Sequence, residues 1–346
     1  MMNDRMVGVE DADVLLLVGT NPRYEAPVLN ARIRKTFLHS DIEIGVIGPN
    51  VDLTYDFTHI GSNAKALDEL LAGKHEFSKV MAGAKKPMII LGSHALKGKS
   101  GPRIFSKILQ MAERLHLHSA EKERKIVNIL HHSASEVGAL DLGYKAGVSA
   151  IVDAPQKMKL LYMLGADENA ITRDKLDPHA FIIYQGHNGD AGAEMADIVI
   201  PGAAYTEKDG TYVNTEGRSQ KGYPAVAPPG DARHDWKIIR AISEVAGKKL
   251  PYDTLPEIRV RLSEIAPHLT RYGDVEESLF LEQVSQLVEK GMVDEDIIPP
   301  QLELEHFWMT NSVTRASPTM AECVKAARNY KENPYLDVPK QHSALV

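Results

Sequence analysis

The chain has 346 residues, of which 43% are hydrophobic and 25% are charged, and its formal net charge is −7. This composition is typical of a folded globular protein and excludes a wholly disordered chain. The acidic charge argues against nucleic-acid binding, which needs a basic surface. A single cysteine, Cys323, excludes an internal disulfide and any zinc or iron–sulfur site built from several cysteines of this chain.

No apolar run approaches the roughly 18 residues that a membrane span requires, so we expect no direct membrane insertion. Residues 1–10 show neither the apolar core of a secretory signal nor the Arg- and Ser-rich character of a transit peptide. We therefore expect any targeting information to lie outside this chain. Because the first apolar run begins as early as Val14, we also expect the chain to be a piece of a longer protein.

Six short apolar runs predict β-strands. Four of them are continuously apolar rather than alternating, which is typical of strands covered on both faces in a parallel sheet, and residues 42–48 and 197–201 are two further candidates. The clearest four stop at or next to a glycine, which lets the chain turn sharply off the strand end. The predicted strands occupy residues 14–18, 42–48, 88–91, 160–164, 181–184 and 197–201.

Helical periodicity fills the gaps between these runs. Pro27 suits the first position of the first helix, and Ser317 followed by Pro318 is typical of an N-cap and first turn. Alternation of strands and helices predicts a doubly wound α/β fold with mostly parallel sheets. The predicted helices cover residues 27–39, 102–116, 234–246 and 255–265, and a last short helix begins near residue 317.

The same pattern predicts three regions. Residues 1–150 form a first α/β, Rossmann-like unit, and residues 151–250 form a second α/β unit. Strand signals end near Gly247, so residues 251–346 are expected to be a helical and extended C-terminal tail.

The loop after the first predicted strand offers a candidate binding site. Gly19, Thr20 and Asn21 connect the strand to a helix start at Pro22. Backbone N–H groups and a helix N-terminus at a strand end can bind an anion or a nucleotide phosphate. The alternative is a tight crossover in which Asn21 and Pro22 form the turn.

A glycine-rich segment, residues 92–100, nearly matches the phosphate-binding P-loop and includes Lys99. It has one residue too many between its glycines, which would spoil the convergence of N–H groups on a phosphate. We therefore expect an ordinary strand-to-helix loop. A nucleotide-binding enzyme remains the alternative, and it would lose binding in Lys99→Ala. The dinucleotide fingerprint G-x-G-x-x-G is absent from the sequence.

Two pairs of histidines invite a metal-site interpretation. His131 and His132 lie close to Glu136 in the sequence, and His116 lies close to His118. A metal site needs three or four converging ligands, and the sequence supplies no obvious remainder. We expect these side chains to be exposed or hydrogen-bonded, and we expect no metal site.

Residues 196–220 contain a short strand that ends at a proline, a loop, and an extended segment that turns at Glu216 and Gly217. Glu207, Glu216 and Arg218 can form a structural ion pair or a catalytic site. A structural role is expected, because paired surface charges are common and catalytic ones are rare.

Two of the segments described above, the Gly19 loop and residues 196–220, resemble the signatures of the molybdopterin oxidoreductase superfamily. The first comprises Ala12, Asp13 and the Gly19–Asn21–Pro22 loop, and the second runs from Ala196 through Pro201, Asn214 and Arg218 to Gln220. Within that superfamily, residues from about 7 to 328 are similar to the C-terminal half of the 75 kDa subunit family of mitochondrial NADH:ubiquinone oxidoreductase, respiratory complex I. The matching segments include residues 16–23, 30–35, 51–55, 181–187, 201–208, 235–241 and 250–255.

The resemblance implies the formate dehydrogenase and DMSO reductase type of fold, and a structural, redox-silent role in electron transfer from NADH to ubiquinone. In the family, 2Fe–2S and 4Fe–4S clusters belong to the N-terminal half, which this chain lacks. The resemblance therefore implies no cofactor, metal or catalytic residue on this chain, with Gly19, Thr20 and Asn21 as a vestigial loop. Where a pterin enzyme would repeat that loop, this chain has Gly165, Ala166, Asp167 and Glu168, an acidic pair that would repel a pyrophosphate.

The implied partners are other subunits of the complex I peripheral arm and the iron–sulfur half. The implied location is the matrix side of the mitochondrial inner membrane. The alternative function is a catalytic molybdopterin-dependent oxidoreductase fragment.

Overall fold

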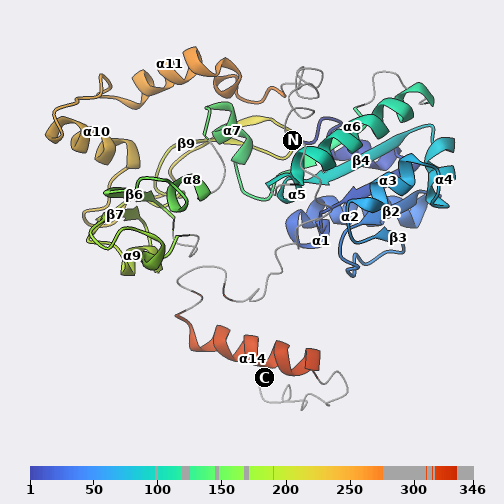
Figure 1. Ribbon diagram of the computed structural model, residues 1–346. Coiled ribbons are helices and arrows are strands. Elements are labelled where there is room, and N and C mark those ends of the chain that lie inside the picture. The colour runs from blue at the N-terminus through green and yellow to red at the C-terminus, as the bar shows by residue number, and fades with distance from the viewer. Residues whose placement is uncertain are drawn as a thin grey trace, which may run out of the picture. The chain divides into compact units, whose positions relative to one another are not determined.

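The computed structural model describes residues 1–97, 100–118, 125–144, 148–166, 171–189, 191–275, 309, 314 and 316–332 (Figure 1). The chain divides into two compact units. The first comprises Met1–Ala150 and Ala203–Gln301, and the second comprises Ile151–Gly202 and Leu302–Val346. The three regions expected from the sequence, with their boundaries at 150 and 250, stay a prediction.

A five-stranded parallel sheet organises the first unit. Its strand order is β3-β2-β1-β4-β5, with β1 in the centre. All five residues of β1 and all six of β4 are buried, as their continuous apolar character predicts. The strands are β1 (Val14–Val18), β2 (Glu43–Ile47), β3 (Thr58–Gly61), β4 (Pro87–Gly92) and β5 (Val127–Leu130).

Helices cover both faces of this sheet, and each face has its own hydrophobic core. On one face, Leu16 and Ile89 pack with Ile108 of α6, and α3 and α4 add further apolar side chains. On the other face, Leu15 and Ile90 pack with α2 and η1. The elements are η1 (Met6–Asp11), α1 (Pro22–Glu25), α2 (Pro27–His39), α3 (Lys65–Leu71), α4 (Phe77–Gly83), α5 (His94–Lys97), α6 (Gly101–His118) and α7 (Glu136–Asp141). Helix α8 (Ser149–Val152) spans the boundary between the two units.

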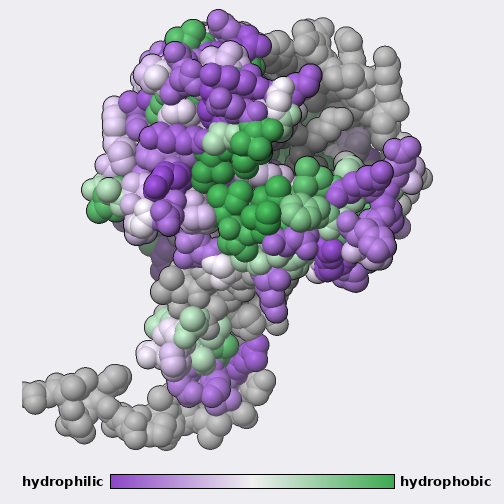
Figure 2. Space-filling model, turned by 90° about the vertical axis from the view of Figure 1, so that its left-hand side faces the viewer, coloured by the Kyte–Doolittle hydropathy of each residue, from purple (hydrophilic) through white to green (hydrophobic). Residues whose placement is uncertain are grey.

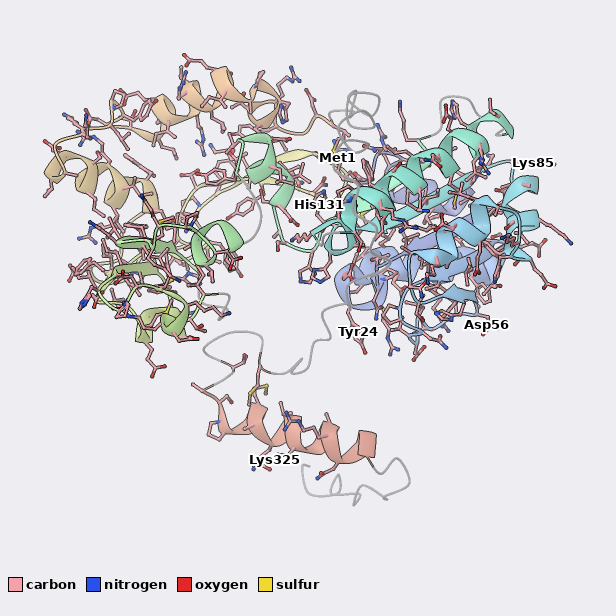
Figure 3. All side chains as sticks on the ribbon, viewed as in Figure 1. Met1, Tyr24, Asp56, Lys85, His131 and Lys325 are labelled. Atoms are coloured by element: carbon pink, nitrogen blue, oxygen red, sulfur yellow. The ribbon has the colours of Figure 1, made fainter. Side chains whose placement is uncertain are left out.

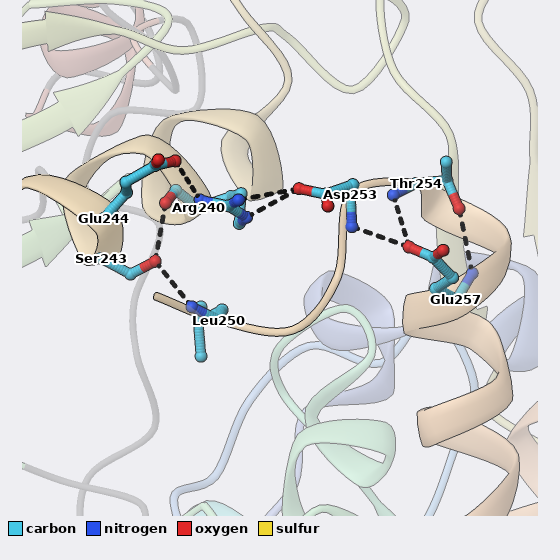
Figure 4. A network of polar contacts seen from close by, with 7 residues as sticks. All are labelled: Arg240, Ser243, Glu244, Leu250, Asp253, Thr254 and Glu257. Carbon is cyan, nitrogen blue, oxygen red and sulfur yellow. Dashed lines mark hydrogen bonds and ion pairs between the residues drawn. The ribbon is translucent and has the colours of Figure 1, made fainter. Parts of the chain in front are cut away.

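An antiparallel hairpin and two helices complete the described part of the first unit. The hairpin joins β9 (Gly210–Val213) to β10 (Ser219–Gly222). Helices α10 (Asp235–Val245) and α11 (Leu255–Ile265) follow, and the 3-10 turn η3 (Pro267–Thr270) lies after them. The Arg240 side chain of α10 donates a hydrogen bond to Asp253 in the loop between α10 and α11 (Figure 4). A capping box formed by Thr254 and Glu257 begins α11.

The second unit contains a three-stranded parallel sheet in the order β6-β7-β8. One face packs on Leu176, Ala180 and neighbouring apolar residues, around the buried Ile182 of β7. The elements are β6 (Leu160–Leu164), η2 (Arg173–Lys175), β7 (Phe181–Gly186), α9 (Ala191–Glu194), β8 (Ile198–Pro201) and α14 (Pro318–Glu332).

The α/β fold with parallel sheets that the sequence predicts is confirmed. All six predicted strands are present, and the helices at 27–39 and 255–265 match their predicted bounds. The sequence did not predict β3 and β5, which are only four residues long and lie at the edges of their sheet. Within the described residues, no helix is both long and apolar enough to cross a bilayer.

Candidate functional site

The loop that the sequence singles out lies where the strand order of the first sheet reverses. From β1 the chain winds outward through β2 and β3, whereas β4 and β5 extend the sheet in the opposite direction. The loops that follow β1 and β4 therefore flank the crevice in which doubly wound sheets bind ligands. Gly19 begins the first of these loops, and Gly92 ends β4.

Backbone atoms of the two loops meet at this crevice. Gly19 has φ +56°, a left-handed conformation that favours glycine, and its N–H donates to the Ile47 carbonyl oxygen at 2.8 Å. A β-carbon built on Gly92 would lie 2.2 Å from the Gly19 carbonyl oxygen. No side chain fits at Gly92, because the β1 loop fills the space in which it would lie.

Glu25 engages the polar groups of the Gly19 loop. The Thr20 hydroxyl donates to Glu25 Oε2 at 2.7 Å, and the Asn21 backbone N–H donates to Glu25 Oε1 at 3.1 Å. Asn21 in turn caps α1, since its Oδ1 accepts the Arg23 N–H at 3.2 Å. Thr20 and Asn21 are both buried. A carboxylate of the chain itself thus lies where a bound anion would accept these hydrogen bonds.

A pocket of about 440 Å³ lies beside this loop within the first unit. Glu25 forms part of its wall, and Figure 3 labels Tyr24, the preceding residue, and His131, which follows β5. The lining combines residues after β5 with residues of the hairpin: His131, His132, Ser133, Ala134, Ser135, Glu136, Val137, Tyr212, Val213, Asn214, Thr215 and Gln220.

Three charged or titratable side chains meet at the wall of this pocket. Lys97 Nζ lies 2.9 Å from Glu136 Oε1, and His131 Nδ1 lies 3.4 Å from Glu136 Oε2. Burial acts to raise the pKa of Glu136, but the hydrogen bond and charge of Lys97 outweigh it and hold this pKa below its usual value. Burial lowers the pKa of His131, against the attraction of Glu136.

The structure thus brings the side chains of His131 and Glu136 together. Across the described part of the chain, no three or more His, Cys, Asp or Glu side chains form a group that could hold a metal ion. Gly98 and Lys99 of the P-loop-like segment lie outside the described residues, as do Asp167 and Glu168.

The acidic residues of the second signature have structural partners. Arg218 Nη2 lies 3.7 Å from Glu216 Oε2, and Glu216 Oε1 accepts the Met6 N–H at 2.9 Å. Glu207 accepts the Ala204 N–H at 2.9 Å within its own loop. The predicted ion pair is confirmed for Glu216 and Arg218, while Glu207 closes a local turn.

Sequence reasoning did not assign a role to Glu25. The available signal was an N-cap residue, Asn21, followed four residues later by an acid. That spacing is one residue longer than in a capping box, so the motif was not recognised.

Two family models match this chain. The model of the molybdopterin oxidoreductase family matches residues 1–245. A second model, which represents the C-terminal region of a subunit of NADH-ubiquinone oxidoreductase, matches residues 274–323.

Curated relatives are named as subunits of NADH-ubiquinone oxidoreductase or as an iron-sulfur protein of NADH dehydrogenase [ubiquinone]. The NADH-ubiquinone oxidoreductase 78 kDa subunit, mitochondrial, of Candida albicans is 45% identical over 94% of this chain and 44% of its own length. NADH dehydrogenase [ubiquinone] iron-sulfur protein 1, mitochondrial, of Solanum tuberosum is 39% identical over 93% of this chain and 42% of its own length. The chain thus spans less than half the length of these relatives.

Among solved structures, acetylene hydratase from Pelobacter acetylenicus superposes with a TM-score of 0.41. The two are 12% identical, and the match covers 79% of this chain and 53% of the other.

Proposed function

The chain belongs to the molybdopterin oxidoreductase family, and we propose that it is a structural, redox-silent domain of the large iron–sulfur subunit of NADH:ubiquinone oxidoreductase, complex I. The names of the relatives and the second family model, over residues 274–323, support this assignment. The chain itself carries no catalytic step in this proposal. It supports electron transfer from NADH to ubiquinone by holding and shielding the part of the subunit that conducts electrons.

The single observation that carries the redox-silent role is the bonding of Glu25. A molybdopterin dinucleotide would bring an anionic pyrophosphate to the crevice between β1 and β4. The Thr20 hydroxyl and the Asn21 N–H already donate to the Glu25 carboxylate there. The pyrophosphate would be repelled by the negative charge of Glu25, and the Thr20 hydroxyl and the Asn21 N–H would not be available to donate to it. These residues therefore do not fit the family cofactor. Gly19, Thr20 and Asn21 are therefore proposed to be a vestigial loop that now caps α1.

The cofactors of the proposed subunit belong to another part of it. The potato relative is named as an iron–sulfur protein, and this chain has one cysteine in its whole sequence. Clusters of the 2Fe–2S and 4Fe–4S types need several cysteine ligands. We place them in the half of the relatives that this chain does not match.

The partners in this proposal are that iron–sulfur half and other subunits of the peripheral arm. The proposed location is the matrix side of the mitochondrial inner membrane. The mitochondrial names of the relatives support this assignment.

Native electrophoresis of mitochondria tests the assignment. An antibody raised against this chain should detect it in the band that reduces a tetrazolium dye with NADH. Detection only at the mass of a free chain, away from that band, would contradict the proposal. Molybdenum-dependent activity in the same fractions would favour a catalytic molybdopterin enzyme instead.

A further inference from the structure

A cavity of about 270 Å³ lies among three helices that cover one face of the five-stranded sheet. Its walls come from the end of α3, one side of α4 and the C-terminal half of α6. These helices contact one another, and they lie together at the right of Figure 1. We call this space the helix cavity. It is separate from the pocket beside the Gly19 loop, because the two share no described lining residue.

Apolar side chains form most of the lining of the helix cavity. Four of them belong to the hydrophobic core on this face and are each no more than 6% exposed: Leu70, Met81, Met111 and Leu115. Leu117, which is 72% exposed, extends the apolar lining toward solvent. Methionine is flexible and polarisable, so Met81 and Met111 allow the lining to adapt to a bound molecule. A mostly apolar cavity of about this size has the character of a site for a small molecule.

One cation interrupts this apolar lining. Arg114 is exposed, and its Nη1 donates to the Leu71 carbonyl oxygen, which holds the guanidinium beside the cavity. In the part of the chain that the structure describes, Arg114 forms no ion pair. Arg103 and Lys107 of the same helix differ, since both pair with Asp68. A guanidinium presents several N–H donors in a planar fork, so Arg114 has donors left for an anionic ligand.

A buried hydroxyl in the same wall lacks an acceptor. Ser78 Oγ, on α4, is buried and has no hydrogen-bond partner among the described residues. Buried polar atoms in folded proteins nearly always have such a partner. An oxygen atom of a molecule bound in the cavity would supply the acceptor that this hydroxyl lacks.

The combination of these features distinguishes the helix cavity from other apolar surface. Hydrophobic residues also gather in one area of the face shown in Figure 2. Apolar surface is common on folded proteins and does not by itself identify a site. The helix cavity adds a concave volume, a guanidinium without an ion pair to any described residue, and a hydroxyl without a described acceptor.

These features together fit a molecule with an apolar chain and a carboxylate. A carboxylate accepts two parallel hydrogen bonds from a guanidinium, and its charge complements that of Arg114. An apolar chain gains about fourfold in affinity for each methylene that it buries. Nucleotides and sugars do not fit, because Ser78 and Arg114 are the only polar side chains in the described lining.

We propose that the helix cavity binds a medium-chain fatty acid, with its carboxylate on Arg114 and its chain against Met81, Met111 and Leu115. The volume of about 270 Å³ limits the ligand to a chain of medium length. A fatty acid bound here would join α3, α4 and α6 and stabilise the first unit. The proposal goes beyond the structural role in complex I and does not depend on it.

Isothermal titration calorimetry of the full-length chain with decanoate tests the proposal. One site should saturate, and hexanoate, which is four methylenes shorter, should bind about tenfold or more weakly. Arg114→Gln should weaken decanoate binding by about tenfold or more, while Arg114→Lys, which keeps the charge, should retain part of the affinity. Arg34→Gln is the matched control, because Arg34 is also exposed and also donates to a backbone carbonyl, that of Thr54. The control should bind decanoate as tightly as the unmodified chain.

Filling the cavity provides a second test. Ala82→Trp adds a large side chain to the lining from an exposed position of α4, and it should abolish decanoate binding. Ala241→Trp, at an exposed position of α10 outside the cavity, should not. Circular dichroism spectra like that of the unmodified chain would show that both variants are folded.

Three results would overturn the proposal: no saturable binding of decanoate, equal binding by Arg114→Gln, or tighter binding of decyltrimethylammonium than of decanoate. A protein partner is the other possible occupant. Loss of the Ala82→Trp chain from the native complex, with no decanoate binding by the unmodified chain, would identify that occupant and would also contradict the proposal.

Discussion

Gly92 faces Gly19 so closely that a β-carbon on Gly92 would lie 2.2 Å from the Gly19 carbonyl oxygen. Gly92 ends β4, and Gly19 directly follows the neighbouring central strand β1. Their contact lies at the crevice that doubly wound sheets commonly use for ligands. In the proposed redox-silent role, the Glu25 carboxylate occupies the anion position at this crevice, because it accepts hydrogen bonds from the Thr20 hydroxyl and the Asn21 N–H.

Gly92→Ala should destabilise the first unit by about 1–3 kcal/mol, because either β1 or β4 must shift to admit the methyl group. Urea denaturation followed by circular dichroism measures the change. Gly83→Ala is the matched control, since a β-carbon at Gly83 has no atom within 4 Å. The control should be neutral or stabilising by up to about 1 kcal/mol. Equal stability of Gly92→Ala and the unmodified chain would show that the two loops are not in contact.

Glu25→Ala should lower the free energy of unfolding by about 1–2 kcal/mol, because the Thr20 hydroxyl and the Asn21 N–H lose their acceptor. The variant should also gain a thermal stabilisation by inorganic phosphate at constant ionic strength, which the unmodified chain lacks. Glu264→Ala, at a 56% exposed side chain paired with Arg261, should stay within about 0.5 kcal/mol of the unmodified chain. Phosphate stabilisation of the unmodified chain would mean that Glu25 does not fill the anion position.

Tyr55→Phe should cost about 1–2 kcal/mol of stability. The Tyr55 hydroxyl donates to Asn30 Oδ1 at 2.8 Å, and both residues are buried between α2 and the loop after β2. Removing the hydroxyl leaves the Asn30 oxygen without its donor. Tyr205→Phe, at a residue that is 71% exposed, is the control and should have no measurable effect in the same denaturation experiment. A neutral Tyr55→Phe would contradict the buried hydrogen bond.

Stability should fall as the pH is lowered below about 6.5, in part because of His131. Burial lowers the pKa of His131 in the folded chain, so the unfolded chain takes up this proton at a higher pH than the folded chain. The folded state therefore loses stability as the pH falls from the ordinary histidine pKa of 6.5 to the lower pKa that His131 has in the folded chain. The Met1 amino group, whose pKa burial lowers to about 6, acts in the same direction.

His131→Gln should consequently lose less stability than the unmodified chain between about pH 7.5 and pH 5.5. Urea midpoints across that range measure the difference, and the Met1 amino group contributes in both proteins. His39→Gln, at an exposed residue at the end of α2, should keep the profile of the unmodified chain. Parallel profiles for His131→Gln and the unmodified chain would contradict the burial of His131.

The sequence predicted the central elements of the fold because they carry strong local signals. The β1 run is apolar over all five residues, and Pro27 marks the first turn of α2 at its observed position. Periodicity assigns no role to the Ala-Asp pairs at residues 12–13 and 196–197, which contribute only to the family resemblance. In the structure Asp13 accepts the N–H groups of Lys85 and Lys86, and Asp197 accepts the N–H of Ile182. Each aspartate thus ties its strand to the neighbouring one.

The features that the sequence did not predict depend on contacts between distant segments, which hydrophobic periodicity does not reveal. The tight approach of Gly92 to Gly19 joins residues that lie far apart in the sequence. The exposure of Leu160 and Phe181 was not expected either, because the apolar runs at 160–164 and 181–184 predicted strands covered on both sides. That prediction concerned composition, whereas the cover depends on where the crossovers pass.

The central claim is that this chain is a redox-silent member of a cofactor-binding family. Elemental mass spectrometry and visible absorbance of the purified chain test it most directly. We expect molybdenum, tungsten, iron and pterin far below one equivalent per chain. Stoichiometric molybdenum or tungsten together with pterin would show that the Gly19 loop is a working cofactor site and would contradict the account.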